Sequence, residues 1–254
     1  MMSLDGEIKL WSSLNGTNIL VVGGSSGIGE AGARALAGYG AQVTIAGRDP
    51  ERLKKAAAAM SGRVKTHAVD ARNPHEIAEM FGAVGPLDHL VITLTGKMGS
   101  GNFRDVDLHE FRQAYDEKFW PHLMLAQAGL KALSPRGSIT FVTGISARKT
   151  TPGGSGYVAV NGALELMVPT LAYELAPLRV NAVSPGFIAT PWYDHIPAVE
   201  MEKAYAQAAR TLPVGRVGQP TDAAQAIVFV VSNGFTTGSV LECDGGARLI
   251  GSHS

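Results

Sequence analysis

The sequence predicts an α/β protein built as a single domain, with a doubly wound, mostly parallel sheet of seven strands and helices on both faces. Short β-rich runs alternate with helical patterns from Asn18 to the end of the chain, and strands joined by crossover helices form parallel sheets. The early runs are nearly all apolar, as is typical of strands that are covered on both faces. No repeat, low-complexity tract or Pro/Gly-rich linker divides residues 1–254.

The predicted strands follow one another at intervals that leave room for a helix between them. In order they are 18–24 (NILVVGG), 42–47 (QVTIAG), 64–69 (VKTHAV), 89–94 (HLVITL), 138–143 (SITFVT), 179–184 (RVNAVS) and 239–243 (SVLEC). The helix after the first strand has one apolar face at helical spacing, formed by Ile28, Ala31, Ala35, Leu36 and Tyr39. We expect residues 1–13 to be a loose N-terminal extension and residues 189–212 to be a lid over the substrate.

The charge balance and the single cysteine argue against several classes of protein. Lys+Arg and Asp+Glu both number 22, so no basic surplus favours a nucleic acid or an anionic membrane as partner. No run reaches the roughly 18 apolar residues of a membrane span, and residues 1–11 lack the apolar core of a signal peptide. Cys243 has no second cysteine to pair with, and the histidines lack metal-ligand spacing. We therefore expect a cytoplasmic protein without a metal site.

A glycine-rich turn follows the first predicted strand and precedes a helix. It reads Gly23-Gly24-Ser25-Ser26-Gly27-Ile28-Gly29. Glycines permit a tight turn and a close approach of the backbone to a phosphate, and the helix N-terminus offers free N–H groups and a positive dipole. Strand, turn and helix in this order predict a site for the pyrophosphate of a dinucleotide, and this context weakens the alternative of a purely structural turn.

The end of the second predicted strand distinguishes between two dinucleotides. NAD-binding proteins usually carry an acid about 20 residues past the glycines, where it binds the ribose hydroxyls. Here the strand ends Ile45-Ala46-Gly47-Arg48, with no acid at its end. A guanidinium can pair with a 2′-phosphate, so Arg48 predicts NADP in preference to NAD. Arg52 is a weaker second candidate, and the alternative for Arg48 is a solvated surface arginine.

Further motifs follow the glycine turn in a consistent order. Asp70-Ala71 comes after the third predicted strand, Asn181-Ala182-Val183-Ser184-Pro185-Gly186 spans the end of the sixth, and Asp244-Gly245-Gly246 follows the seventh. Together with the glycine turn, in which Val22 replaces a threonine, they make residues 15–249 similar to the short-chain dehydrogenase/reductase family. The resemblance implies a single-domain Rossmann fold, hydride transfer between a nicotinamide and a carbonyl or secondary alcohol, and a homo-oligomer (tetramer or dimer). The cofactor-binding residues that it implies are Gly23, Ser25, Ser26, Gly27, Ile28, Gly29, Arg48, Asp70, Ala71, Thr95, Gly96, Pro185, Gly186, Ile188 and Thr190.

The catalytic positions depart from the family pattern of Asn, Ser, Tyr and Lys. Tyr157 matches the tyrosine, but Asn161 occupies the position of the lysine, and Lys118 occupies the position of the asparagine. Gly144 stands where the serine is expected, which leaves Thr143 or, as a fallback, Ser146 to hold the substrate oxygen.

An exchange of lysine and asparagine is chemically workable. A tyrosine with a pKa of about 10 needs a nearby cation to serve as an acid or base near neutral pH, and Lys118 can supply it from another helix. Lys118 shares a helical face with Phe111, Tyr115, His122 and Leu125, and Pro121 is expected to disturb that helix because it cannot donate to the carbonyl of Glu117. The alternative is a surface lysine that snorkels to solvent.

The sequence thus predicts an NADP-dependent oxidoreductase of a small carbonyl or alcohol substrate. Tyr157 is the predicted general acid/base, Lys118 the activating cation, Asn161 the residue that orients ribose or water, and Thr143 the donor to the substrate oxygen. Trp192 and Tyr193 can form an aromatic wall over the substrate, or pack on each other within the lid. The rival prediction is a catalytically impaired dinucleotide-binding protein that acts as a cofactor sensor or interaction module.

Overall fold

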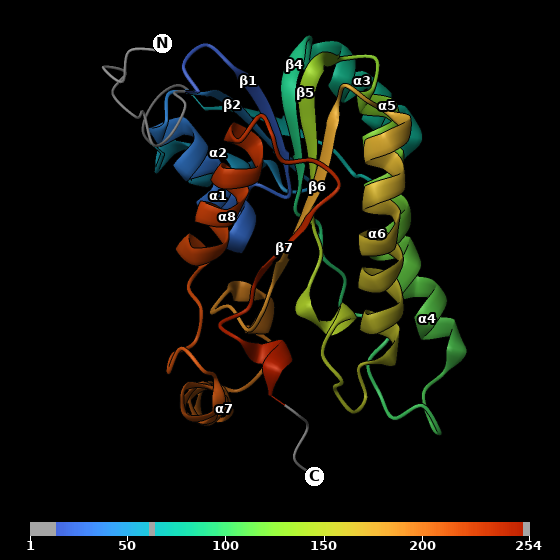
Figure 1. Cartoon of the computed structure of the whole chain (residues 1–254), viewed down its shortest axis with the longest axis vertical. Helices are drawn as coiled ribbons and strands as arrows, with labels where there is room; N and C mark the ends of the chain where they lie inside the picture. The colour runs from blue at the N-terminus through green and yellow to red at the C-terminus, as the bar shows by residue number, and fades with distance from the viewer. Residues whose placement is uncertain (1–13, 61–63, 251–254) are drawn as a thin grey trace, which may run out of the picture.

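The central feature of the fold is one parallel sheet in the order β3-β2-β1-β4-β5-β6-β7, which confirms the predicted α/β architecture (Figure 1). The computed structural model describes residues 14–60 and 64–250, so the predicted extension at 1–13 lies outside the described residues. The strands are β1 (Asn18–Val22), β2 (Gln42–Gly47), β3 (Lys65–Ala68), β4 (Leu87–Ile92), β5 (Leu133–Val142), β6 (Arg179–Pro185) and β7 (Val240–Cys243).

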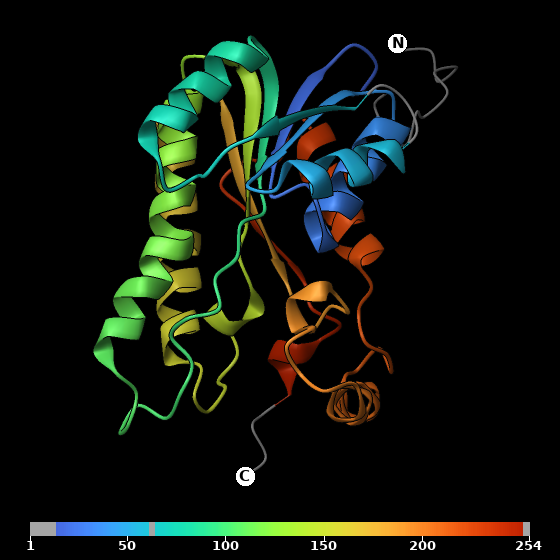
Figure 2. The same cartoon turned by 180° about the vertical axis from the view of Figure 1, so that it is seen from behind.

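Helices cover both faces of the sheet, with α1, α2 and α8 on one side and α3, α5 and α6 on the other (Figures 1 and 2). The helices are α1 (Gly27–Gly38), α2 (Pro50–Ala58), α3 (Pro74–Val84), α4 (Leu108–Ala114), α5 (Trp120–Gly129), α6 (Ser155–Glu174), α7 (Ala198–Thr211) and α8 (Pro220–Ser232). Short turns of other helix types are η1 (Tyr115–Phe119), η2 (Ile145–Ala147), η3 (Pro191–Tyr193) and η4 (Ala247–Leu249).

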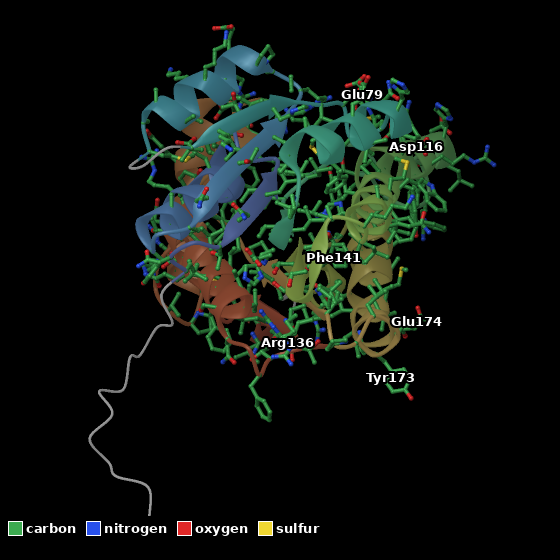
Figure 3. The ribbon with its side chains drawn as sticks, turned by 90° about the horizontal axis from the view of Figure 1, so that it is seen from above. Glu79, Asp116, Arg136, Phe141, Tyr173 and Glu174 are labelled. Atoms are coloured by element: carbon green, nitrogen blue, oxygen red, sulfur yellow. The ribbon has the colours of Figure 1, made fainter. Side chains whose placement is uncertain are left out.

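Strand β1 shows why the central strands are rich in apolar residues. Ile19 and Val21 pack in the core on the side of α1 and α8, whereas Leu20 and Val22 pack in the core beneath α3, α5 and α6. Because successive side chains point to opposite faces, a strand with helices on both sides carries a nearly continuous apolar run rather than an alternating one. Phe141 of β5 is likewise fully buried in the interior, whereas Tyr173 at the end of α6 projects outward (Figure 3).

Two strands begin earlier than their sequence patterns predicted. Strand β4 begins at Leu87 and ends at Ile92, and the backbone N–H and side-chain hydroxyl of the next residue, Thr93, both donate to the Val22 carbonyl oxygen. Strand β5 begins at Leu133, where it pairs with Leu87 before a shift in register. Both differences lie in irregular pairing that a residue pattern does not reveal.

The carboxyl ends of all seven strands point to one end of the molecule, the lower end in Figure 1. The irregular connections at 95–106, 145–156 and 185–197 gather there, together with α7. The chain adds β2 and β3 on one side of β1 and then adds β4 to β7 on the other side, so the direction in which strands are added reverses between β1 and β4. Open α/β sheets bind ligands in the crevice outside such a switch point.

Candidate active site

A cavity of about 880 Å³ opens at the carboxyl ends of the strands. Every residue that the sequence predicted for cofactor binding or catalysis lines this cavity. The glycine turn and Arg48 lie in its wall, as do Lys118 and Tyr157, so residues far apart in sequence share one space. The described residues contain no cluster of three or more His, Cys, Asp or Glu side chains suited to a metal ion.

The glycine turn between β1 and α1 has the backbone shape that a phosphate site requires. Gly23 has φ +89° and Gly27 has φ +55°, which are left-handed values that favour glycine. A Cβ atom at Gly23 would lie 2.5 Å from the Thr93 hydroxyl oxygen, so no larger residue fits there. The turn leads directly into the N-terminus of α1, and the site therefore fits the pyrophosphate of a dinucleotide.

The far end of the cavity is cationic. Arg48 and Arg52 line it and are exposed. The carboxylate of Asp49, the residue next to Arg48, already has hydrogen-bond partners. It caps α2 and accepts from the backbone N–H groups of Glu51 and Arg52, each at 3.0 Å. Asp70 also lines the cavity, and its hydrogen bonds with Arg72 hold the pKa of its carboxyl below the usual value. Two arginines and the Asp70 carboxylate thus line this end of the cavity.

A single π-helical turn, η1, places Lys118 inside the molecule. Pro121 cannot donate a hydrogen bond to the carbonyl of Glu117, and the backbone N–H of Trp120 instead donates to the Tyr115 carbonyl oxygen, five residues back. His122 Nδ1 lies 2.7 Å from the Lys118 carbonyl oxygen, an acceptor, so the ring carries its proton on Nδ1. The predicted disturbance of this helix is present, and π-helical turns are frequent at functional sites.

Lys118 is buried rather than snorkelling, with only 8% of its surface exposed. Its ammonium group donates to the main-chain carbonyl oxygen of Thr143 at 2.9 Å. Burial lowers the pKa of Lys118 from 10.5 to about 8, and the negative charge of Glu165 acts in the opposite direction. Lys118 therefore exchanges its proton at a pH far closer to neutral than an exposed lysine does.

Asn161 and the two residues with candidate hydroxyl groups, Thr143 and Ser146, line the cavity. The Asn161 amide nitrogen donates to the Ser146 hydroxyl oxygen at 2.9 Å, and its buried oxygen Oδ1 has no hydrogen-bond partner. The Thr143 hydroxyl donates to the Glu165 carboxylate at 2.8 Å and is therefore directed away from the open cavity. Of the two hydroxyls, Ser146 is the one whose own proton remains available to a ligand.

Tyr157, at the start of α6, is in contact with the irregular connection at 95–106, the loop after β4. Its hydroxyl donates to the Lys97 carbonyl oxygen at 2.8 Å, and the Trp192 indole N–H donates to the Gly96 carbonyl oxygen at 3.2 Å. The Tyr157 and Trp192 rings meet edge to face with centroids 6.2 Å apart. Burial raises the pKa of Tyr157, so the side chain holds its proton tightly in this arrangement.

Glu117 holds the same loop from the other side. Its carboxylate oxygen Oε2 accepts from the backbone N–H groups of Lys97 at 2.8 Å and Met98 at 3.3 Å. Glu117 was not predicted as a site residue, nor were Glu165 and Arg148, which form an ion pair at 2.8 Å in which Glu165 is buried and Arg148 is partly exposed. A signal for Glu165 was present: it is the only acid in the apolar run 162–173, one helical turn after Asn161.

Comparison with known proteins identifies the family of this chain. The family model described as enoyl-(acyl carrier protein) reductase matches residues 22–248. A short-chain dehydrogenase/reductase of Stachybotrys chlorohalonatus, ATR9, is 32% identical over 93% of this chain and 99% of its own length. The chain belongs to the short-chain dehydrogenase/reductase family. The 3-oxoacyl-[acyl-carrier-protein] reductase FabG of Rickettsia prowazekii is 30% identical over 93% of this chain and 99% of its own.

Solved structures of this short-chain dehydrogenase/reductase family superimpose on nearly the whole chain. A small-chain dehydrogenase in complex with NADPH has a TM-score of 0.79 and 32% identity, and covers 92% of this chain and 99% of its own. The MalC reductase/Diels-Alderase of Malbranchea aurantiaca has a TM-score of 0.86 and 28% identity, with 93% and 98% covered. The protein is thus an oxidoreductase of the short-chain family. In the described part of its chain, no helix combines the length and hydropathy needed to cross a membrane.

Proposed function

We propose that this protein is an NADP-dependent oxidoreductase that transfers a hydride between the nicotinamide and a carbonyl or secondary alcohol. The observation that supports the proposal is one cavity that is lined by the glycine turn, by Arg48 and by the side chains of Lys118, Tyr157 and Asn161. When bound, the nicotinamide supplies or accepts the hydride. The protein must hold both reactants, exclude water and move one proton at the substrate oxygen.

The cofactor preference rests on the two cations at the ribose end. Arg48 and Arg52 face this part of the cavity, and the neighbouring carboxylate of Asp49 is already engaged as a helix cap. A guanidinium binds phosphate with charge-assisted hydrogen bonds. The 2′-phosphate of NADP therefore gains a partner that NAD lacks, and NADP is the proposed cofactor.

The proton is assigned to Tyr157, which lines the cavity beside Trp192. Its pKa is raised by burial, and the charges of Glu117 and Glu110 raise it further against a hydrogen bond with Ser100. A base with a raised pKa needs a positive charge to work near neutral pH. Lys118 is proposed to supply that charge, and Asn161 is proposed to orient a ribose hydroxyl or a water through its unpartnered oxygen.

Ser146 is favoured over Thr143 as the donor to the substrate oxygen. Thr143 was the first prediction from the sequence, but its hydroxyl donates to Glu165 and it is 5% exposed. Ser146 lines the cavity, accepts from Asn161 and keeps its own proton for another acceptor. Tyr157 and Ser146 then act on the same oxygen, one as proton donor and the other as an orienting group.

The rival prediction of a sensor without turnover loses its main argument. It depended on the absence of a lysine at position 161 and of a serine at position 144, and it would be favoured by a Lys118 ammonium group in solvent. Lys118 is instead buried and bonded at the floor of the cavity. We also infer assembly into a tetramer or dimer, on the basis of the family resemblance, and a cytoplasmic location, which the sequence led us to expect.

A panel of carbonyl compounds tests the proposed function. Each compound is incubated with the protein and either NADPH or NADH, and loss of the reduced cofactor is followed by absorbance. Turnover of at least one ketone or aldehyde with NADPH, and slower turnover with NADH, supports the proposal. Tight binding of NADPH without turnover of any member of the panel would favour the sensor.

A further inference from the structure

Glu165 is a buried carboxylate beneath the cavity to which the proposed reaction gives no role. It lies on α6 one turn after Asn161, and its side chain is 4% exposed. Its helix neighbours Leu164 and Val168 are fully buried in the apolar core. An ionised carboxylate in such a place is strongly unfavourable unless cations and hydrogen-bond donors compensate for it.

Thr143 joins Glu165 to Lys118. The Thr143 hydroxyl donates to Glu165 Oε1 at 2.8 Å, and the carbonyl oxygen of the same residue accepts from the Lys118 ammonium group at 2.9 Å. The negative and positive charges therefore sit on opposite sides of one residue. Glu165 is also the charge that counteracts the effect of burial on Lys118.

A second cation lies on the other side of Glu165. Arg148 Nε donates to Glu165 Oε2 at 2.8 Å, and Arg148 Nη1 lies 3.2 Å from Glu242 Oε1. The charges alternate from the cavity outward in the order Lys118, Glu165, Arg148, Glu242. Lys118 and Glu165 are buried, whereas the side chains of Arg148 and Glu242 are 40% and 24% exposed. Arg148 therefore competes with Lys118 for the same carboxylate.

We propose that Glu165 is the counter-ion that keeps Lys118 positively charged at the floor of the cavity, and so acts as a positioning residue for the reaction. Its catalytic consequence rests on the proposed function, but the charge pairing itself does not. The other groups near Lys118 do not take this part. His122 is neutral because burial lowers its pKa to about 3, the Glu117 carboxylate is bonded to the loop after β4, and Tyr157 holds its proton.

Direct titration of Lys118 tests the pairing without any substrate. The protein is labelled with [ε-¹³C]lysine, and the chemical shift of each lysine is followed against pH by NMR. The Lys118 resonance is assigned by its loss in Lys118→Arg. Glu165→Gln keeps a hydrogen-bond acceptor for Thr143 and removes the charge, and we expect the Lys118 midpoint to fall by about one pH unit.

Two further variants fix the sign and the location of the effect. Arg148→Gln removes the competing cation and is expected to raise the Lys118 midpoint. Glu242→Gln makes the same chemical change as Glu165→Gln on the far side of Arg148, and it is expected to move the midpoint clearly less. An unchanged midpoint in Glu165→Gln, or an equal shift in Glu242→Gln, overturns the proposal. If Glu165→Gln does not fold, as judged by circular dichroism, the upward shift in Arg148→Gln decides, and its absence overturns the proposal.

The pH–rate profile separates this inference from the proposed function. In alcohol oxidation the rate rises with pH as Tyr157 loses its proton, and loss of the Lys118 charge is expected to move that rise to higher pH. A merely structural role for Glu165 lowers the rate without moving the rise. A shifted NMR midpoint with an unmoved rate profile supports the charge pairing and contradicts the catalytic part assigned to Lys118.

Discussion

The Tyr157 hydroxyl donates to the main-chain carbonyl oxygen of Lys97 at 2.8 Å. The proton that the proposed reaction needs is therefore bound to the loop after β4 in this structure, and a substrate carbonyl must take the place of the Lys97 oxygen. Glu117 and Trp192 hold the same loop through its Lys97 and Met98 N–H groups and its Gly96 carbonyl. The loop after β4 thus links the proposed acid, the aromatic wall and the π-helical turn.

Tyr157→Phe removes only the hydroxyl and is expected to leave folding and cofactor binding intact. If Tyr157 is the general acid/base, turnover falls by about 10²–10⁴-fold. Steady-state kinetics on any accepted substrate measure the loss, and titration of NADPH checks binding. Near-wild-type turnover would show that the proton comes from another group.

Arg48→Ala removes the proposed partner of the 2′-phosphate. A hydrogen bond to a charged group contributes about 1.5–3 kcal/mol, so we expect roughly a ten- to a hundredfold loss of NADPH affinity and little change for NADH. Fluorescence titration with both cofactors measures this difference. Arg136→Ala is the matched control, because Arg136 is exposed and does not line the cavity. Equal losses for both cofactors would mean that Arg48 binds no phosphate.

Glu117→Gln weakens the attachment of the loop after β4, because a neutral amide oxygen accepts from backbone N–H groups less strongly than a carboxylate. We expect the amide hydrogens of Lys97 and Met98 to exchange with solvent about tenfold faster. Hydrogen-exchange mass spectrometry or NMR measures the rates. Asp116→Asn is the control, since Asp116 is the exposed neighbour of Glu117. Unchanged exchange in Glu117→Gln would show that the carboxylate does not hold the loop.

Acid is expected to destabilise the protein through its buried histidines. Burial lowers the pKa of His89 to about 4 and that of His122 to about 3, whereas an unfolded histidine titrates near 6.5. Between those values the unfolded chain binds more protons than the folded one. The free energy of unfolding is therefore highest above about pH 6.5 and falls as the pH drops towards 4.

Urea denaturation at pH 7, 5.5 and 4.5, values chosen to bracket this window, measures the effect. His89→Gln keeps a side chain that can bond to Ser138 and removes the titration, so we expect a shallower loss of stability, by about 1–2 kcal/mol at the lowest pH. His75→Gln, at an exposed histidine, serves as the control. Identical pH dependence in the wild type and His89→Gln would contradict the assignment.

The sheet and the cofactor end of the site were predictable from local sequence. The run at 19–22 is apolar at every position and is followed by a glycine turn, so strand, turn and helix are specified within about a dozen residues. The inward direction of Lys118 was predictable for a similar reason, because it shares a helical face with His122 and Leu125 and precedes Pro121.

The hydrogen bonds among the polar groups of the site were not predictable in the same way. Whether the Thr143 hydroxyl faces a substrate or Glu165 depends on how β5 and α6 pack, and these elements contribute residues 22 positions apart. Glu117 is a surface charge by its pattern alone, and only the path of the loop after β4 brings two backbone N–H groups to it. A residue pattern specifies which face is buried, but not which polar atoms meet there.

The exchange of Lys118 and Asn161 is the central claim, and a double-mutant cycle tests it most directly. Turnover with NADPH is measured for the wild type, Lys118→Asn, Asn161→Lys and the double variant. Asn161→Lys alone puts two cations beside one tyrosine and is expected to be impaired, as is Lys118→Asn, which has none. The account predicts that the double variant is more active than the two single losses add up to, with a coupling of about 0.5–3 kcal/mol. Strictly additive losses would contradict it.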